Sequence, residues 1–300
     1  MSGREEMAQL LTVRDWLRYA VSRFNAAGLV YGHGTATALD EAAFLILHAL
    51  HLPVDQLDPW LDCRLLSGER QDVHRIINAR IETRKPAPYL TGQAWIQGHS
   101  FYVDERVIVP RSYIGELLAG DLEGIAAEPE NTASVLDLCT GSGCLAILAA
   151  LRFENARIDA SDLSPEALAV AKRNVEDYGL AERVTLVQSD LFSGLTGRRY
   201  DLILANPPYV DSEAVVAFPP EYAAEPRLAH WGGDDGLDIV RKILRQAAEF
   251  LAPQGRLVVE IGQGRALLEA EFAHMPFLWL DTAESAGEVF SLARSDLSGN

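Results

Sequence analysis

Strand-like and helix-like segments alternate through the second half of this 300-residue chain, and that alternation limits the folds open to it. From about Ser134, short apolar runs are separated by longer amphipathic stretches. Strands joined through helices pack into a mostly parallel sheet with right-handed crossovers, which places helices on both faces. The sequence therefore predicts an α/β protein with a doubly wound, seven-stranded sheet, whose strands are SVLDL, ARIDAS, VTLVQS, YDLILA, RLVVEIG, FLWLDT and EVFSLAR.

Apolar residues in the N-terminal region recur at helical spacing instead. Helices are expected around residues 13–24, over 36–50 and around 73–81, and further helices within the α/β part over 144–153, 165–178 and 237–251. The aromatic and β-branched segment after KPAP (85–88) is typical of a hairpin. We therefore predict a helical substrate-recognition domain over residues 1–88, a hairpin linker over 89–110 and an α/β domain over 111–300.

Composition and charge exclude several classes of protein. No run of 18 uncharged apolar residues exists, and MSGREEMAQL lacks the apolar stretch of a signal peptide. The three cysteines have no metal-ligand spacing, so we expect a reduced, cytoplasmic protein without a metal site. Residues 1–100 carry 10 basic and 11 acidic side chains, and the remainder carries almost all of the net charge of −17. Such acidity disfavours direct nucleic-acid binding and permits a basic protein partner.

The segment DLCTGSG, residues 137–143, lies on the first strand-to-helix turn of the predicted sheet. Gly141 and Gly143 let the backbone turn tightly and let a ligand approach it closely. Asp162 follows at the end of the second strand, where a carboxylate can accept both hydroxyls of a ribose. Ala146 replaces the third glycine of a dinucleotide fingerprint and no phosphate-loop lysine follows. A nucleoside cofactor without a pyrophosphate fits this pattern best.

The segment LILANPPYVD, residues 202–211, begins as a buried strand and ends in two adjacent prolines. Proline fixes φ at about −65° and removes an N–H donor. The side-chain oxygen of Asn206 and the carbonyl of Pro207 are then two acceptors at fixed separation, which suit a planar NH₂ group. Tyr209 offers that group a flat stacking surface. We predict that this turn binds a planar nitrogen and that the reaction needs no general base. The predicted substrate-binding residues are Asn206, Pro207, Pro208 and Tyr209. Of these, Asn206, Pro207 and Tyr209 are predicted to be catalytic.

These motifs together resemble the class I, Rossmann-like methyltransferases that use S-adenosyl-L-methionine to modify planar nitrogens. The upstream segments PAPYLTG and FYVDERVIVPRS are similar to those of the PrmB and PrmC (HemK) group of glutamine methyltransferases. Release-factor enzymes of that group carry proline where Ser112 stands, so the resemblance is to the PrmB branch. It runs from about residue 36 to the end. The resemblance implies that the cofactor-binding residues are Asp137, Cys139, Thr140, Gly141, Gly143, Asp162, Asp190, Leu191 and Asn206, with Asp190 and Leu191 beside the adenine.

The function implied by the resemblance is methyl transfer to a glutamine side-chain amide of a basic ribosomal protein, the third protein of the large subunit. Three alternatives stay open. A release factor could be the substrate. The NPPY motif also occurs in enzymes that methylate the exocyclic amine of adenine in DNA or RNA, although the acidic charge opposes that reading. A non-catalytic assembly factor could keep the fold, but here the cofactor loop and the NPPY turn are both present.

Overall fold

The computed structural model describes residues 8–126 and 129–297. Their contacts divide the chain into two compact units. The smaller unit comprises Met1–Ala94 together with Pro219–Ala224, and the larger unit comprises Trp95–Phe218 and Glu225–Asn300. The short segment Pro219–Ala224 therefore belongs with residues that lie far from it in the sequence. No helix among the described residues is long and apolar enough to cross a membrane.

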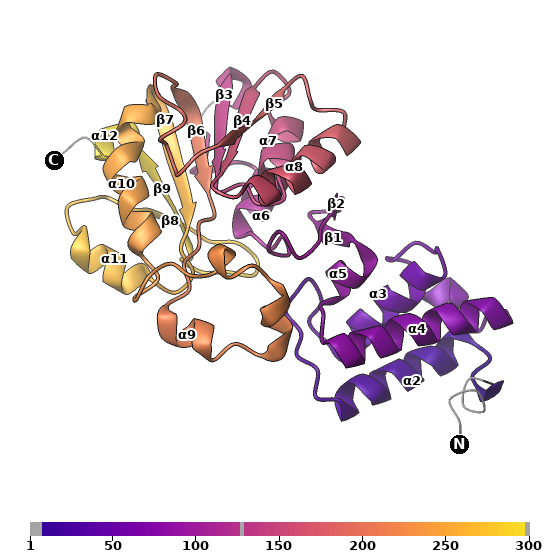
Figure 1. Cartoon of the computed structure of the whole chain (residues 1–300). Helices are drawn as coiled ribbons and strands as arrows, with labels where there is room; N and C mark the ends of the chain where they lie inside the picture. The colour runs from indigo at the N-terminus through magenta and orange to yellow at the C-terminus, as the bar shows by residue number, and fades with distance from the viewer. Residues whose placement is uncertain (1–7, 127–128, 298–300) are drawn as a thin grey trace. The chain divides into compact units, whose positions relative to one another are not determined.

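The smaller unit is helical, as its apolar spacing predicts (Figure 1). Trp16, Phe24, Leu45 and Ile77 are buried in its core. Thr12 caps α2 (Val13–Ala26) by accepting a hydrogen bond from the amide of Asp15, which satisfies one of the free N–H groups of the first turn. The elements of this unit are α2 (Val13–Ala26), α3 (Ala38–Ala49), η1 (Asp58–Trp60), α4 (Ser67–Thr83), α5 (Ala87–Thr91) and η3 (Pro220–Ala224).

The predicted hairpin is shorter than its sequence pattern indicates. Its strands are β1 (Gln93–Ile96) and β2 (His99–Tyr102), and PAPYLT forms the helical turn α5 instead of extended chain. The side chain of Thr91 bonds to the carbonyls of Ala87 and Pro88, which favours the helical turn. Residues 103–112 form no strand, and the amide of Val109 donates to a side chain, Glu225, instead of to a strand partner.

The larger unit contains the predicted seven-stranded sheet, in the order β5-β4-β3-β6-β7-β9-β8. The first five strands of this sheet along the chain are parallel, and β9 is antiparallel to both of its neighbours. The strands are β3 (Ser134–Leu138), β4 (Arg157–Asp162), β5 (Val184–Gln188), β6 (Tyr200–Ala205), β7 (Leu251–Glu260), β8 (Leu278–Leu280) and β9 (Val289–Ala293).

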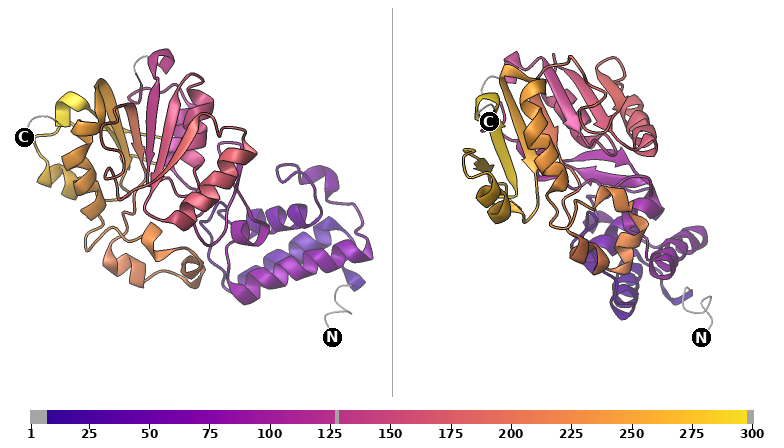
Figure 2. Two further views of the ribbon diagram at one scale, coloured as in Figure 1. Left: turned by 45° about the horizontal axis from the view of Figure 1, so that its top comes forward. Right: turned by 60° about the vertical axis from the view of Figure 1, so that its left-hand side comes forward.

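Helices cover both faces of this sheet, as Figure 1 and Figure 2 show. Val135 of β3 faces a core that includes residues of α6, α7 and α8, and Leu136 faces a second core that includes residues of α10, α11 and α12. Side chains alternate across a strand, so a strand buried on both faces is apolar throughout. The helices are α6 (Tyr113–Ala119), α7 (Cys144–Arg152), α8 (Pro165–Asp177), α9 (Ser212–Val216), α10 (Asp238–Phe250), α11 (Arg265–Glu271) and α12 (Arg294–Leu297), with short 3₁₀ turns η2 (Pro129–Asn131) and η4 (Arg227–Ala229).

The strand register places the predicted site residues at one edge of the sheet. Leu138 of β3 lies beside Ser161 of β4 and Ala205 of β6, and Asp162 lies beside Gln188 of β5. Each of the segments predicted to bind the cofactor or substrate starts at or just beyond one of these strand ends. In parallel sheets ligands bind outside the carboxyl ends of the strands, so this edge is the expected place for a site.

Candidate functional site

A cavity in the larger unit opens at the carboxyl edge of β3, β4, β5 and β6. Seven of the twelve predicted site residues line it: Cys139, Gly141, Asp162, Asp190, Leu191, Asn206 and Pro208. The remaining predicted residues lie outside this lining: Asp137, Thr140, Gly143, Pro207 and Tyr209. The structure thus brings residues from four separate loops to one cavity wall.

The loop after β3 is shaped by a buried carboxylate. Asp137 is 1% exposed and accepts hydrogen bonds from the hydroxyl of Thr140 and, at 3.0 Å, from the amide of Ala146 in α7. Burial raises the pKa of Asp137 to about 7. Asp137 and Thr140 therefore fix the conformation of the turn through buried hydrogen bonds. The cavity wall itself is formed by Cys139 and Gly141 of the same loop.

The two glycines of this loop have different surroundings. Both have positive φ angles, 55° for Gly141 and 81° for Gly143, which favour glycine. A Cβ at position 143 would approach the Cβ of Ala171 to 3.1 Å, so Gly143 permits the loop to pack against α8. A Cβ at position 141 would meet no protein atom within 4 Å, and Gly141 lines the cavity. Gly141 therefore leaves its side of the cavity open for a ligand.

Cys139 also has a left-handed backbone, with φ of 62°. This conformation is strained for a residue that carries a side chain. Burial raises the pKa of the Cys139 thiol far above its ordinary value, and that of Cys144 to about 12. Neither thiol is ionised near neutral pH, so Cys139 contributes an apolar surface to the cavity and not a nucleophile.

Asp162 links the second strand to the glycine loop. One carboxylate oxygen accepts from the amide of Gly141 and the other from the amide of Ser164, each at 2.9 Å. Burial raises the pKa of Asp162 above its ordinary value. A carboxylate has about four lone-pair positions, so two backbone hydrogen bonds leave room for two hydroxyl donors from a ligand in the cavity.

The loop after β5 forms the next part of the wall. Asp190 and Leu191, which the sequence resemblance predicts to lie beside the adenine, both line the cavity. Leu191 has a positive φ of 48°, and its carbonyl accepts a 2.6 Å hydrogen bond from the hydroxyl of Ser189. The amide of Ser189 in turn donates to the carbonyl of Asp162 at 2.9 Å, which ties this loop to the one after β4.

The NPPY turn follows β6 and presents Asn206 to the cavity. Pro207 is buried and Pro208 is partly exposed. Within the described part of the chain, the side-chain amide of Asn206 has no hydrogen-bond partner. A polar side chain at a cavity wall with its hydrogen-bonding capacity unused is available to a ligand.

Tyr209 is held by residues that sequence reasoning missed. Its hydroxyl donates to a carboxylate oxygen of Glu260 at 3.1 Å. Three glycines lie against it: a Cβ at position 262 would come within 2.8 Å of the Tyr209 ring, and Cβ atoms at 232 and 236 would collide with the backbone of residues 208 and 209. The segments HWGGDDGLD and EIGQG contain these glycines, and their repeated Gly was the available sequence signal.

Glu260, at the end of β7, connects Tyr209 to the segment that precedes α6. Its second oxygen accepts from the hydroxyl of Ser112 at 2.7 Å and from the amide of Tyr113 at 3.0 Å. Burial raises the pKa of Glu260 to about 7. Ser112 is therefore bonded to the same carboxylate as the tyrosine of the NPPY turn.

A second buried carboxylate organises the loop that returns toward α10. Glu225 forms two hydrogen bonds of 2.8 Å with the guanidinium of Arg111, and His230 lies 3.0 Å from it. His230 also accepts from the amide of Val210 through its carbonyl. These contacts bring further residues to the cavity wall that the sequence did not mark, among them Arg106, Val107, Ile108, Pro226, Leu228, Ala229 and Ile239.

Curated proteins of one kind align with almost the whole chain. The ribosomal protein uL3 glutamine methyltransferase of Bradyrhizobium diazoefficiens is 54% identical over 295 residues, 96% of this chain and 92% of that protein. That of Neisseria gonorrhoeae is 55% identical over 291 residues, 97% of each chain. The chain belongs to the family of ribosomal protein uL3 glutamine methyltransferases. Its residues 117–218 also match the Methyltransferase small domain family.

Membership of this family confirms the enzyme class that the sequence motifs predict. The chain is a methyltransferase with the class I, Rossmann-like α/β fold, and S-adenosylmethionine is its methyl donor. Among solved structures, the hMettl16 catalytic domain in complex with a 3′ UTR hairpin has a TM-score of 0.50 and 14% sequence identity. That match covers 93% of this chain and 90% of the other, and at such low identity it supports the fold alone.

Proposed function

We propose that this chain transfers the methyl group of S-adenosylmethionine to the side-chain amide nitrogen of a glutamine in ribosomal protein uL3. The observation that carries this proposal is the cavity wall: Asp162 and Asn206 lie on it together, and the Asn206 amide has no partner among the described residues. The curated relatives named for this activity match both the helical and the α/β part of the chain.

The residues present fit S-adenosylmethionine. Gly141 leaves open space at the wall, Asp162 has lone pairs for ribose hydroxyls, and apolar side chains such as Leu191 suit an adenine ring. We assign the direct contacts to the loop residues that line the cavity, and we assign Asp137 and Thr140 the role of fixing that loop. When bound, the cofactor supplies an electrophilic methyl group on a sulfonium.

The NPPY turn would hold the substrate. The side-chain oxygen of Asn206 and the carbonyl of Pro207 would accept the two protons of the glutamine NH₂ group, and Tyr209 would support its plane. An amide nitrogen is a poor nucleophile because its lone pair is delocalised. Acceptors aimed at its protons stabilise the positive charge that develops on the nitrogen as it attacks, so positioning and electrostatics supply the rate enhancement.

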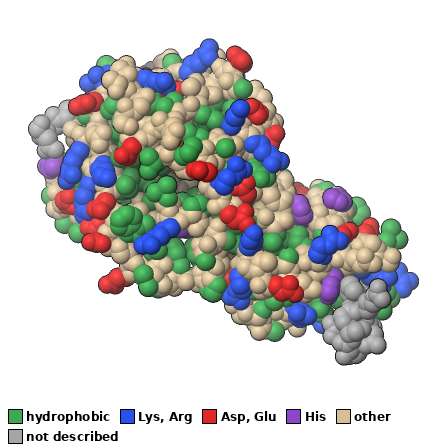
Figure 3. All heavy atoms as spheres, in the orientation of Figure 1, with side chains coloured by type: hydrophobic (Ala, Val, Ile, Leu, Met, Phe, Trp, Pro, Cys, Tyr) green, Lys and Arg blue, Asp and Glu red, His purple; other side chains and the backbone are tan. Residues whose placement is uncertain are grey.

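Charge supports a basic protein substrate. The chain carries a net charge of −17, which attracts a basic ribosomal protein and repels nucleic acid. On the face of the molecule drawn in Figure 3, Lys and Arg side chains are mixed with Asp and Glu side chains. We place the reaction in the cytoplasm, where ribosomal proteins are made, and expect no direct binding to nucleic acid or membrane.

The experiment that tests this function supplies purified uL3, a release factor and an adenine-containing RNA in parallel with labelled S-adenosylmethionine. We expect label on uL3 alone, and peptide mapping should place one methyl group on a glutamine side chain. Asn206→Ala is the matched control, because it should bind the cofactor but transfer little label. Label on RNA or on the release factor, with none on uL3, would show that the substrate assignment is wrong.

A further inference from the structure

The segment Pro219–Ala224 follows the NPPY turn by ten residues yet belongs to the helical unit. It forms the short 3₁₀ turn η3, and the ring of Tyr222 lies 4.4 Å from the ring of His33. The chain therefore leaves the α/β unit after Phe218, makes contacts within the helical unit, and resumes in the α/β unit at Glu225. The loop that begins at the NPPY turn is therefore held by contacts within the helical unit.

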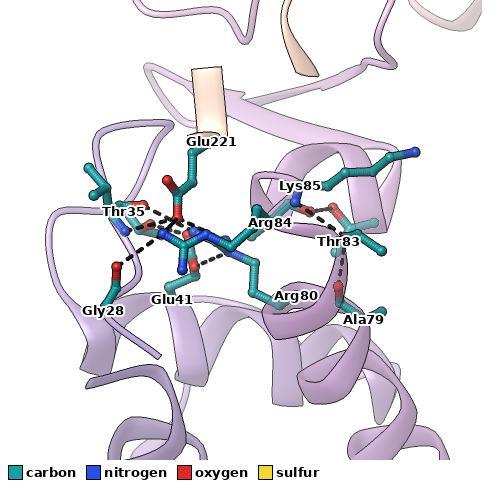
Figure 4. A network of polar contacts seen from close by, with 12 residues as sticks. Gly28, Thr35, Glu41, Ala79, Arg80, Thr83, Arg84, Lys85 and Glu221 are labelled. Atoms are coloured by element: carbon teal, nitrogen blue, oxygen red, sulfur yellow. Dashed lines mark hydrogen bonds and ion pairs between the residues drawn. The ribbon is translucent and has the colours of Figure 1, made fainter. Parts of the chain in front are cut away.

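The anchor is Glu221, whose side chain is fully buried (Figure 4). One carboxylate oxygen lies 2.8 Å from Nη2 of Arg84 and 3.7 Å from Nη1 of Arg80, and it accepts from the amide of Val30 at 3.1 Å. Arg80, also fully buried, bonds to Glu41 at 2.6 Å. Figure 4 shows the carboxylates of Glu221 and Glu41 directed at the two arginines.

The charges of this network balance only when Glu221 is present. Glu41 and Glu221 supply two negative charges, and Arg80 and Arg84 supply two positive ones. Removing one member of a buried ion pair leaves an uncompensated charge in a medium of low dielectric, which strongly disfavours the buried arrangement. The two arginines of the helical unit therefore stabilise the buried carboxylate of Glu221, and they hold the segment Pro219–Ala224 in the helical unit.

The residues after the segment are fixed just as firmly within the α/β unit. Glu225 bonds to Arg111 and to the amide of Val109, and the carbonyl of His230 accepts from the amide of Val210, next to Tyr209. The loop between the NPPY turn and α10 is consequently held at Glu221 by one unit and at Glu225 by the other. A change at Glu221 would be transmitted along the loop that bears Tyr209.

We propose that Glu221 is a positioning residue for methyl transfer, through which the helical unit holds the loop that follows the substrate turn. This inference rests on the proposed function of the NPPY turn. It gives residues 8–94 a second role besides substrate recognition: they restrain the substrate loop through Arg80 and Arg84. We expect S-adenosylmethionine binding to be independent of this restraint, because the cavity-lining residues of the same loop, Pro226, Leu228 and Ala229, lie beyond Glu225, which Arg111 holds within the α/β unit.

The test uses the full-length chain with Glu221→Gln, and Glu213→Gln as the matched control, since Glu213 is an exposed glutamate of α9 in the same loop. For Glu221→Gln we expect kcat on uL3 to fall about tenfold or more, with the Kd for S-adenosylmethionine unchanged. Hydrogen exchange at the amides of residues 221–224 should accelerate. Glu213→Gln should match the wild type in all three measurements.

Arg84→Gln is the second variant, because Arg84 is partly exposed and its loss is easier to accommodate if Glu221→Gln does not fold. It should reproduce the same pattern. An unchanged kcat in a folded variant would overturn the proposal, and so would an effect confined to KM. Hydrogen exchange requires no substrate, so it separates this inference from the proposed function. If the wild-type enzyme fails to methylate uL3 but exchange at residues 221–224 is still faster in the variants, the proposed function is wrong, whereas the restraint of this segment by Arg80 and Arg84 is confirmed.

Discussion

Replacing Gly262 by alanine should slow methyl transfer by displacing the ring of Tyr209. Gly262 follows β7 and has a positive φ of 56°. A Cβ there would lie 2.8 Å from Cε2 and 2.9 Å from Cδ2 of Tyr209. The ring cannot simply rotate away, since its hydroxyl is bonded to Glu260 and two further glycines, Gly232 and Gly236, enclose its backbone.

The magnitude follows from the geometry. The ring must recede from 2.8 Å to an ordinary contact distance of 3.4 Å, a displacement of about 0.6 Å. Misplacing a reacting group by about 1 Å can cost roughly 10²-fold in rate, so we expect kcat to fall about tenfold. The left-handed backbone adds a stability cost of about 1–2 kcal/mol, because a Cβ is disfavoured at positive φ.

Gly179→Ala is the matched control for this change. Gly179 has a similar φ of 67°, but a Cβ there would meet nothing within 4 Å. Both variants should show the stability cost of the left-handed backbone in denaturant unfolding, Gly262→Ala should lose further stability through its contact with the Tyr209 ring, and only Gly262→Ala should lose rate in single-turnover transfer to uL3. Cofactor titrations should give wild-type affinity for both. Equal methyl-transfer rates for the two variants would refute the role of Tyr209 in substrate binding. The displacement of the Tyr209 ring would then affect stability alone and not the reaction.

Three other substitutions test separate parts of the site. Asp162→Ala should weaken S-adenosylmethionine binding by about 1.5–3 kcal/mol, the contribution of charge-assisted hydrogen bonds, and Asp162→Asn should fall between because it keeps an acceptor for the Gly141 amide. Unchanged affinity by calorimetry would exclude the ribose assignment. Asn206→Ala should reduce kcat about 10²–10³-fold or more while cofactor affinity stays at the wild-type value, and wild-type turnover would mean that the turn only terminates β6. Glu260→Gln should change how stability depends on pH. The pKa of Glu260 is raised from 4.5 to about 7, so between these values the folded state holds a proton that the unfolded state has released, and wild-type stability falls as pH rises through that window. The variant lacks this proton, so its stability relative to wild type should increase from pH 4.5 to 7 by at most about 3 kcal/mol, and a difference that is constant with pH would show that Glu260 titrates normally.

The structure also changes how a truncation of the helical region would be interpreted. A chain that starts near Phe101 loses Arg80 and Arg84, and Glu221 would then have neither of these partners. Such a chain could lose activity because its substrate loop is released, even if the helical unit never touches uL3. Single substitutions at Glu221 and Glu213 separate the two explanations, since they leave the rest of the helical unit in place.

The sequence by itself determined the features that depend on neighbouring residues. The strand and helix periods identified the seven-stranded sheet and its helices, among them α8 over the predicted residues 165–178. Gly141 and Gly143 marked a loop with left-handed backbone, and the two prolines after Asn206 marked a rigid turn. Each of these signals arises from backbone conformations that a few adjacent residues impose on their own. The local structure can therefore be predicted at these positions without knowledge of the rest of the chain.

Only the tertiary structure decided which distant groups meet. Strand order placed Glu260 beside Tyr209 of the NPPY turn, 51 residues earlier, and Glu221 meets Val30 across 191 residues of sequence. No local pattern distinguishes these two glutamates from the other acidic residues of the chain. The physical reason is that a charged side chain is buried only where its partners are, and packing of distant segments chooses those partners. The same holds for α5, whose turn is favoured over a strand by the Thr91 hydroxyl and by contacts with α3 and α4.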